Sequence, residues 1–550
     1  MGRRGIIILA ALLLVVPLNA QKKSELKAIW LEAESHYLYG EYELANPLYL
    51  ILDDLIPGNA NIKYKIGNCY LNIFDEKPKA IPFLEAAVKN TDYSSRSNLL
   101  KEKKAPLDAY FSLATSYLIA NKLDSALLTY QMFRRLLAES DGMTNQEFID
   151  QQIQACNIAS EKMKSPINVQ INPLKEYINQ GSVNDRPVVS FDGRTMAYTE
   201  KRGLENVVFV TRKEGNGWGT PVDITVEAAM GSDCRTTSLN SDGTELFLFK
   251  NDNFDGNIYV TRYVNGKWTP VTKLNKNINT KYYESHASVS PDGRKLYFAS
   301  NREGSLGELD LWMSEKDASD DWGVPVNLGN TVNTPFNEET PFISNDGKTL
   351  TFSSEGHGSM GGYDFFITRF GTAGWSKPEN MGYPLSTTDD DLGYQPVNDG
   401  AYGFYSLMTG YKKKEIAEVT FNTPPDERQL DTITTGKMVT ISFDLDSLPY
   451  ITITDSSTLI RDLIMKDVLS TDVEDADILY YTVQVMALYN PVDPAYFEHA
   501  TIRVFYNRFD RFFRYTTGQF ATLQEAYAEK ERLLNLGYPT DIFIKKVYRE

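Results

Sequence analysis

The stretch SPDGRKLYFAS, residues 290–300, decides the fold of the middle of this chain. Its first four residues are typical of a tight turn, and an apolar run that includes Leu296 and Phe298 follows. Together they predict a turn that leads into a buried strand. The pattern returns as SFDGRTMAYTE, NSDGTELFLFK, SNDGKTLTFSS and the weaker VNDGAYGFYSL, which begin at residues 190, 240, 344 and 397.

Two landmarks repeat with nearly constant spacing. The Asp-Gly pairs follow one another at intervals of 50, 50, 54 and 53 residues, at Asp192, Asp242, Asp292, Asp346 and Asp399. A tryptophan with a proline shortly after it recurs with a similar spacing, at Trp218, Trp268, Trp322 and Trp375. The proline suits an outer edge strand, where a missing backbone donor does little harm. A period near 50 with several short strands per unit predicts an all-β propeller over residues 166–421.

The last repeat lacks a Trp-Pro outer strand, and the segment before the first repeat can supply it. Residues 166–177 look like an outer strand, and Ile178-Asn179 matches the Ile278-Asn279 that follows the second unit's outer strand. We therefore expect this segment to complete the last unit and close a ring of five blades, or six if residues 436–455 contribute. The repeats resemble the TolB-like, WD-related propeller repeats of bacterial envelope proteins.

Residues 22–165 show apolar residues at helical spacing instead of alternation. Three units each place a small residue four positions before a bulkier one, at Ala45 and Tyr49, Ala80 and Leu84, and Ala126 and Tyr130. This all-α region resembles the tetratricopeptide repeat, which implies paired helices around a groove for a peptide or protein. Residues 91–104 look like an insertion, and Gln146 to Lys164 are predicted to form a capping helix. A helical brace for the propeller is the alternative.

The first 20 residues have the pattern of a signal peptide. Arg3 and Arg4 precede an apolar run from Ile6 to Val16, and Ala20 offers a small residue at the cleavage site. An uncleaved membrane anchor is the alternative, but the run is short for a bilayer span. No later stretch predicts a transmembrane helix, so we expect an exported chain in the periplasm, associated with the outer membrane or the cell wall.

Composition narrows the classes of partner and cofactor. The net charge of −17 argues against nucleic acid as a partner. The three cysteines are far apart in 550 residues and form no zinc spacing, so we expect buried thiols and no metal or other cofactor. A glycine motif at Gly356, Gly358 and Gly361 precedes a predicted strand, whereas a dinucleotide site needs a helix there. We identify no catalytic residues and predict that the chain is not an enzyme.

Residues 422–478 are predicted to be a linker and an unassigned segment, and residues 479–550 a small α/β domain. Strands are expected over residues 480–488, 500–506, 511–517 and 541–548, with a short helix at 494–499 and an amphipathic helix at 523–536. This β-α-β-β-α-β order, with motifs such as FRYTTGQF at 513–520, resembles the SPOR domain. That resemblance implies peptidoglycan binding, with Gln484, Arg514 and Tyr515 contacting the glycan; the alternative is that Tyr515 is an ordinary core residue.

The order of parts resembles peptidoglycan-associated periplasmic components of outer-membrane machines. It is similar to the tetratricopeptide–propeller subunit of the type IX secretion and gliding apparatus, although that family ends in an OmpA-like domain. We therefore predict a non-enzymatic scaffold that binds envelope or secretion-system proteins through its helices and propeller and anchors the complex to peptidoglycan. The alternatives are a propeller enzyme or ligand sensor with its site in the central funnel, and a TolB-like envelope-integrity protein.

Overall fold

The computed structural model describes residues 24–422 and 478–548, apart from 75, 140–145, 176, 204, 216, 253–254, 308, 399, 411–412, 489–496, 498, 508–511, 537 and 539–542. The expected signal peptide and nearly all of the expected linker, with the segment that would add a sixth blade, lie outside these residues. The chain divides into two units, Met1–Glu161 with Glu474–Arg549, and Lys162–Val473 with Glu550. Within the described residues, no helix combines the length and the apolar character needed to cross a bilayer.

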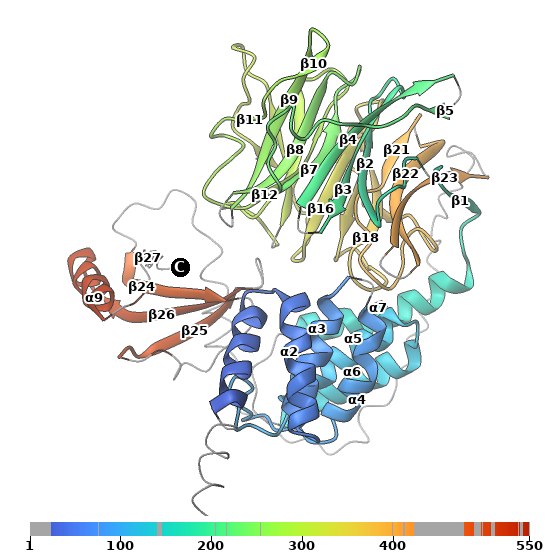
Figure 1. The fold of residues 1–550 in the computed structure, drawn as a ribbon. Helices are drawn as coiled ribbons and strands as arrows, with labels where there is room; N and C mark the ends of the chain where they lie inside the picture. Colours follow the sequence, from blue (N-terminus) through green and yellow to red (C-terminus); the bar gives the residue numbers. More distant parts are fainter. Residues whose placement is uncertain are drawn as a thin grey trace, which may run out of the picture. The chain divides into compact units, whose positions relative to one another are not determined.

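The N-terminal region consists of helices joined by loops (Figure 1). Residues 24–38 are helical, followed by α2 (Tyr42–Leu55), α3 (Ala60–Asn72), the short η1 (Lys77–Lys79), α4 (Ala80–Ala87), α5 (Asp108–Ile119), α6 (Leu123–Glu139) and α7 (Gln146–Lys164). The predicted last helix has the bounds of α7, and the predicted insertion joins α4 to α5.

Small residues bring these helices close together. Ala45, Ala80 and Ala126 are fully buried. At Gly67 of α3 an added Cβ would lie 2.4 Å from Cγ of Leu84 on α4, so any larger residue would push the two helices apart. The small-residue positions of the sequence are therefore helix contacts.

The β-rich unit consists of antiparallel groups that follow the sequence repeats (Figure 1). The first two are β2 (Val183–Val189), β3 (Thr195–Arg202), β4 (Glu205–Glu214), β5 (Gly217–Trp218) and β6 (Val222–Asp223), then β7 (Cys234–Leu239), β8 (Glu245–Asp252), β9 (Asp255–Val264), β10 (Lys267–Trp268) and β11 (Thr272–Lys273). The third is β12 (Glu284–Val289), β13 (Lys295–Ser300), β14 (Asp310–Glu315) and β15 (Val326–Asn327). The fourth is β16 (Glu338–Ile343), β17 (Thr349–Ser354), β18 (Asp364–Gly371), β19 (Gly374–Trp375) and β20 (Glu379–Asn380). The helical region followed by these sheets is a multidomain, α-then-β, propeller-like fold.

The last group contains β21 (Gln395–Val397), β22 (Tyr402–Gly410) and β23 (Lys413–Phe421) and receives a strand from far upstream. Strand β1 (Val169–Pro173) pairs antiparallel with β23, from Val169 opposite Phe421 to Pro173 opposite Ala417. The predicted pairing of the segment before the first repeat with the last repeat is therefore confirmed.

The asparagine that motivated this prediction has a repeated role. Asn179 bonds both backbone groups of Ile416, accepting at 2.8 Å and donating at 3.0 Å. Asn279 does the same to Ile258, at 2.7 and 2.9 Å, and Asn333 to Leu311, at 2.8 and 3.0 Å. An asparagine thus forms hydrogen bonds to the third strand of a group at three equivalent places. At one of these places the bonded residues are 237 apart in the sequence.

Outer strands are shorter than the sequence predicts. The expected strand over 322–328 contains only β15, and Trp322 makes an isolated bridge with Lys316. In three other groups the edge is split into two-residue pieces on either side of the proline, as in β19 and β20 around Pro378. Proline has no N–H for the ladder, so pairing is interrupted there.

The C-terminal module contains β24 (Ile478–Leu488), β25 (Ile502–Asn507), β26 (Phe512–Phe520), α9 (Leu523–Asn535) and β27 (Phe543–Tyr548), in the sheet order β25-β26-β24-β27. Thr522 and Glu525 form a capping box that begins α9. The four predicted strands and the second predicted helix are present, and the predicted helix at 494–499 lies largely outside the described residues.

Candidate functional site: a charged cluster at the centre of the propeller unit

The inner strands of the sheets share an irregularity near their first residues. The pairing register shifts between Asp185 and Val188 in β2, and between the matching residues of β7, β12 and β16. At these shifts Arg186, His286 and Thr340 have positive φ angles of 52°, 42° and 47°. Such angles are uncommon outside glycine, and β-branched Thr340 is an outlier. Strained backbone of this kind tends to occur at functional sites.

Ionisable side chains converge at these irregularities. We call the set the central charged cluster: Asp185, Arg186, Arg235, His286, Glu339 and Lys414, from β2, β7, β12, β16 and β23. Lys414 Nζ lies 2.9 Å from Asp185 Oδ1, and His286 Nδ1 lies 3.5 Å from Glu339 Oε2. The ring of His286 stacks on Phe249 with centroids 6.0 Å apart. Sheets that are distant in the sequence therefore contribute to one polar centre.

The protonation states within the cluster follow from burial and from neighbouring charges. Burial, followed by the positive charges of Arg186 and Arg235, holds the pKa of His286 well below its usual range. Burial alone would raise the pKa of Asp185, but Lys414 and Arg186 outweigh it and lower that pKa. The imidazole of His286 is therefore neutral at neutral pH, and the carboxylate of Asp185 is ionised.

Two donors of the cluster are not used within the described part of the chain. Neither ring nitrogen of His286, which is only 7% exposed, makes a hydrogen bond, and Nη1 of Arg186 is buried without a partner. Buried polar atoms are normally satisfied, so these atoms call for an explanation. Arg235, in contrast, is exposed to solvent.

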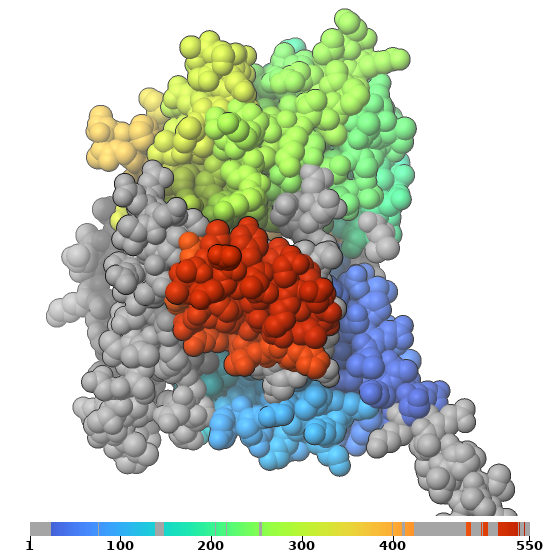
Figure 2. Space-filling view, turned by 90° about the vertical axis from the view of Figure 1, so that its left-hand side faces the viewer, coloured from blue at the N-terminus to red at the C-terminus, as the bar shows by residue number. Residues whose placement is uncertain are grey.

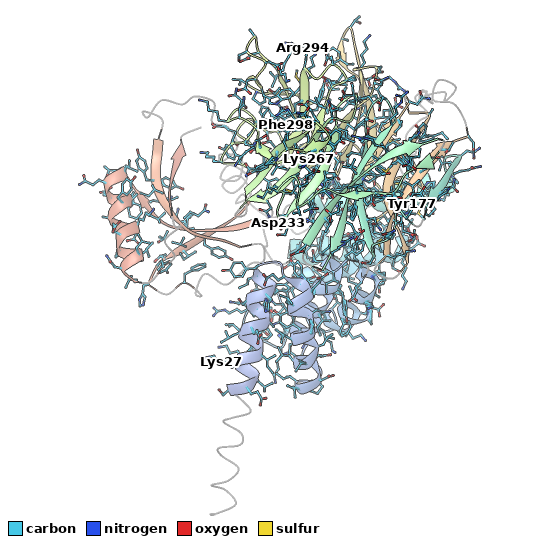
Figure 3. All side chains as sticks on the ribbon, turned by 45° about the horizontal axis from the view of Figure 1, so that its top comes forward. Lys27, Tyr177, Asp233, Lys267, Arg294 and Phe298 are labelled. Carbon is cyan, nitrogen blue, oxygen red and sulfur yellow. The ribbon has the colours of Figure 1, made fainter. Side chains whose placement is uncertain are left out.

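The opposite ends of the same inner strands are closed. Gln395 donates to the carbonyl of Val189 at 2.6 Å and accepts from its N–H at 2.8 Å. Phe191 and Phe342 stack there with ring centroids 5.8 Å apart. Only a cavity of about 10 Å³ remains among these residues. The two ends are marked in Figure 3 by Asp233, just before β7, and Arg294, in a turn after β12.

The three glycan-binding residues expected from the sequence do not form one exposed surface. Tyr515 is fully buried and packs with Val483, Phe497 and Leu533. The expectation of an exposed ring at Tyr515 is therefore wrong, because a ring without accessible surface cannot stack on a sugar. Tyr515 belongs to the core between the sheet and α9.

Gln484 lies on the other side of the sheet from Tyr515. Gln484 is opposite Thr516, and the backbone of Arg514 is opposite Ala487 and Phe505. Because side chains alternate along a strand, Gln484 and its partner Thr516 face away from Tyr515. Gln484 is 7% exposed, and its Oε1 has no hydrogen-bond partner within the described residues. The side chain of Arg514 lies outside the described residues.

Other sequence features have structural roles. The glycines at 356, 358 and 361 lie in a loop between β17 and β18. The described residues contain no group of three or more side chains that could hold a metal ion. The three cysteines, Cys69, Cys156 and Cys234, are free and buried, as predicted.

The central charged cluster was missed at the sequence level, although a signal exists. Its members on the inner strands occupy the seventh and sixth positions before the Asp of the Asp-Gly pairs. These positions hold Asp185-Arg186, Arg235-Thr236, Ser285-His286 and Glu339-Thr340. The polar residues at these two positions differ between repeats that are otherwise similar. Such variation indicates that these residues have a role other than maintaining the fold of the repeat.

No protein-family model and no curated protein matches this chain. Among solved structures it is similar to TolB from Acinetobacter baumannii (16% identity, TM-score 0.31, covering 43% of this chain and 54% of that one). An α-L-arabinofuranosidase from Lactobacillus brevis (15%, 0.33, 46% and 94%) and a gluconolactonase from Xanthomonas campestris (12%, 0.28, 46% and 96%) are also similar. The chain thus spans about half of this TolB. None of these low similarities bears on activity.

Proposed function

We propose that this protein is a non-enzymatic periplasmic scaffold with a five-bladed propeller. It binds envelope or secretion-system proteins through its helical repeats and propeller, and its C-terminal module anchors the complex to peptidoglycan, as in a type IX secretion-like machine. The observation that supports partner binding most directly is an apolar stripe on helix α2.

The stripe on α2 has three large apolar side chains on its solvent side. Leu44, Ile51 and Leu55 are 55%, 46% and 44% exposed. Their spacing of seven and four residues places them on one face of the helix. The face that carries Tyr49 and Leu52 is fully buried in the helical core. Single exposed apolar residues are ordinary, whereas an aligned row on one helix is typical of a protein contact.

Photo-crosslinking in cells tests the proposed partner contact. A crosslinker at position 51 should capture a discrete envelope protein, and Leu44→Ser with Leu55→Ser should abolish the capture. A crosslinker at Tyr93, which is 73% exposed in the inserted loop, is the matched control and should capture nothing discrete. Equal capture at both positions would contradict a specific surface on α2.

The proposed wall contact rests on the element order of the C-terminal module. Figure 2 shows the described residues of this module as one continuous red surface. The full chain should sediment with purified peptidoglycan sacculi, and the chain ending at residue 425 should not. Arg514→Ala should weaken sedimentation, and thermal unfolding should show that the module stays folded. Sedimentation that persists without the module would place the wall contact elsewhere.

A ligand sensor that uses the funnel is the second candidate function. It is favoured by the unsatisfied donors of the central charged cluster, described above. Ligand binding there would not contradict a scaffold, since the two roles use different surfaces.

A further inference from the structure

We propose that the central charged cluster is a binding site for a carboxylate group, presented by a small organic acid or by the C-terminus of a peptide. This inference does not depend on the proposed scaffold function. It rests on three properties of the cluster, namely its unsatisfied donors, its two arginines and the exposure of Arg235.

The donors fit a planar oxyanion. Nη1 of Arg186 and Nε2 of His286 are buried and make no hydrogen bond within the described residues. A guanidinium presents its N–H groups in a fork that matches a carboxylate, and a neutral imidazole with its proton on Nε2 adds a third donor. The lowered pKa of His286 agrees with a neutral ring. An oxyanion at this place would satisfy atoms that are otherwise left unpaired.

Two arginines of the cluster favour an anion. Asp185 is already engaged by Lys414 at 2.9 Å, and Glu339 lies beside His286. Arg186 and Arg235 both lie close enough to His286 to lower its pKa. Guanidinium groups are the side chains best suited to bind a carboxylate.

The two ends of the inner strands differ. Arg235 is exposed to solvent. The other end is closed by the bonds between Gln395 and Val189 and by the stacked pair Phe191 and Phe342. We therefore expect a ligand to enter past Arg235 with its carboxylate leading, so that the rest of the molecule remains toward solvent.

Calorimetric titration of the full chain in a cationic amine buffer of low ionic strength tests the site. The probes are acetate, trialanine and trialanine amide. We expect acetate and trialanine to bind with dissociation constants of about 1 mM or tighter, which corresponds to two or three charge-assisted bonds. The amide should not bind, because it lacks the carboxylate. Trialanine binding at least about tenfold tighter than acetate would identify a peptide terminus as the source, and equal affinities a small acid.

Arg235→Gln should weaken acetate binding about tenfold or more, as expected for the loss of one bond to a charged group. The matched control is Arg294→Gln, an exposed arginine at the closed end, which should bind like the unmodified chain (Figure 3). His286→Asn is a second site variant that keeps a residue tolerant of positive φ, and it should also weaken binding. Thermal unfolding checks that each variant is folded.

Three results would overturn the proposal. The first is the absence of any heat of binding with acetate or trialanine at a concentration of about ten times the expected dissociation constant. The second is that the amide binds as tightly as trialanine. The third is that Arg235→Gln and His286→Asn are folded and still bind acetate as tightly as the unmodified chain.

Discussion

Two equivalent sites in the propeller unit each bury a glutamate carboxyl group, but the charged residues around the two groups differ. We call each buried carboxyl group, together with the residues around it, a junction. Glu284 and Glu338 are equivalent residues, 54 positions apart, and both are fully buried. Each accepts two hydrogen bonds from the threonine four residues earlier, at 2.8 and 2.6 Å in one case and 2.9 and 2.6 Å in the other. Each also accepts one from a serine, Ser300 or Ser354.

Only Glu284 has a cation beside it. Arg302 Nη2 lies 3.2 Å from its Oε1, and the same guanidinium donates to the carbonyls of Asn277 and Ile278 at 2.9 and 2.6 Å. The equivalent of Arg302 beside Glu338 is Gly356, where an added Cβ would lie 2.3 Å from Oγ1 of Thr334. No side chain fits there without a shift of Thr334.

The junction of Glu338 instead contains a second acid. Burial raises the pKa of Glu338 well above its usual value, and the nearby Asp310 raises it further. Burial also raises the pKa of Glu284, but Thr280 and Arg302 act against it. The comparison teaches that the repeat preserves the hydrogen bonds and not the neighbouring charge: one carboxyl lies beside an arginine, and the other lies near a second acid.

Removal of the arginine should have the largest effect. Arg302→Ala leaves Glu284 buried without a counter-charge, so we expect the free energy of unfolding of the propeller unit to fall by about 3–5 kcal/mol at pH 7. Urea unfolding followed by tryptophan fluorescence measures this. Arg294→Ala, at an exposed turn, should change it by less than about 0.5 kcal/mol. A small loss for Arg302→Ala would mean that the two junctions are electrostatically alike.

The buried acids at junctions that lack an arginine should make the free energy of unfolding depend on pH. The next junction resembles that of Glu338: burial raises the pKa of Asp364 from 3.8 to about 7, and that of Asp391 also lies well above its usual value. The folded state retains protons that the unfolded chain releases above pH 4, so stability decreases as pH rises from about 4 to about 7. We expect a loss of about 2 kcal/mol between pH 5 and pH 7 from Asp364 alone.

Urea unfolding at a series of pH values tests this expectation. Asp364→Asn should flatten the profile, whereas Asp320→Asn, whose side chain is 78% exposed, should leave it unchanged. Because the buried His286 and His357, whose pKa values are lowered, act in the opposite direction over this range, the comparison of Asp364→Asn with the unmodified chain is the decisive one. An unchanged slope in Asp364→Asn would show that Asp364 is ionised in the folded state.

Replacement of each glutamate by its amide should act in opposite directions. Glu284→Gln removes the anion beside a buried guanidinium, and we expect a loss of about 1–2 kcal/mol at pH 7. Glu338→Gln removes an acid whose pKa burial and Asp310 raise, and a small gain of up to about 1 kcal/mol is expected at the same pH. Losses of equal size would indicate that both carboxyls are ionised.

These junctions also show what the sequence can and cannot predict. The spacing of Asp-Gly and Trp-Pro landmarks predicts the repeats, and the match of Ile178-Asn179 to Ile278-Asn279 predicts that β1 joins β23. Both depend on local patterns that repeat. The central charged cluster depends on residues such as Arg186 and Lys414, which come together only through ring closure, and so local pattern alone does not predict it.

The C-terminal module illustrates an error of a different kind. The resemblance to the SPOR domain groups Gln484, Arg514 and Tyr515, although adjacent residues of a strand face opposite sides. That alternation is enough to exclude a shared surface for Arg514 and Tyr515 from the sequence alone. It does not predict the bulge in β24, which changes the register between Gln484 and Met486.

The smallest and most discriminating test compares the two threonines. Thr280 and Thr334 each donate through Oγ1 to their glutamate at 2.6 Å and each accept from a backbone N–H at 3.1 Å. Substitution by valine therefore removes the same two bonds from both junctions.

A hydrogen bond to an ionised group contributes about 1.5–3 kcal/mol and one to a neutral group about 0.5–1.5 kcal/mol. Thr280→Val should thus cost about 1 kcal/mol more than Thr334→Val at pH 7, and the difference should vanish in the backgrounds Glu284→Gln and Glu338→Gln. If it persists there, it arises from packing around the threonines and not from the charge of the glutamates.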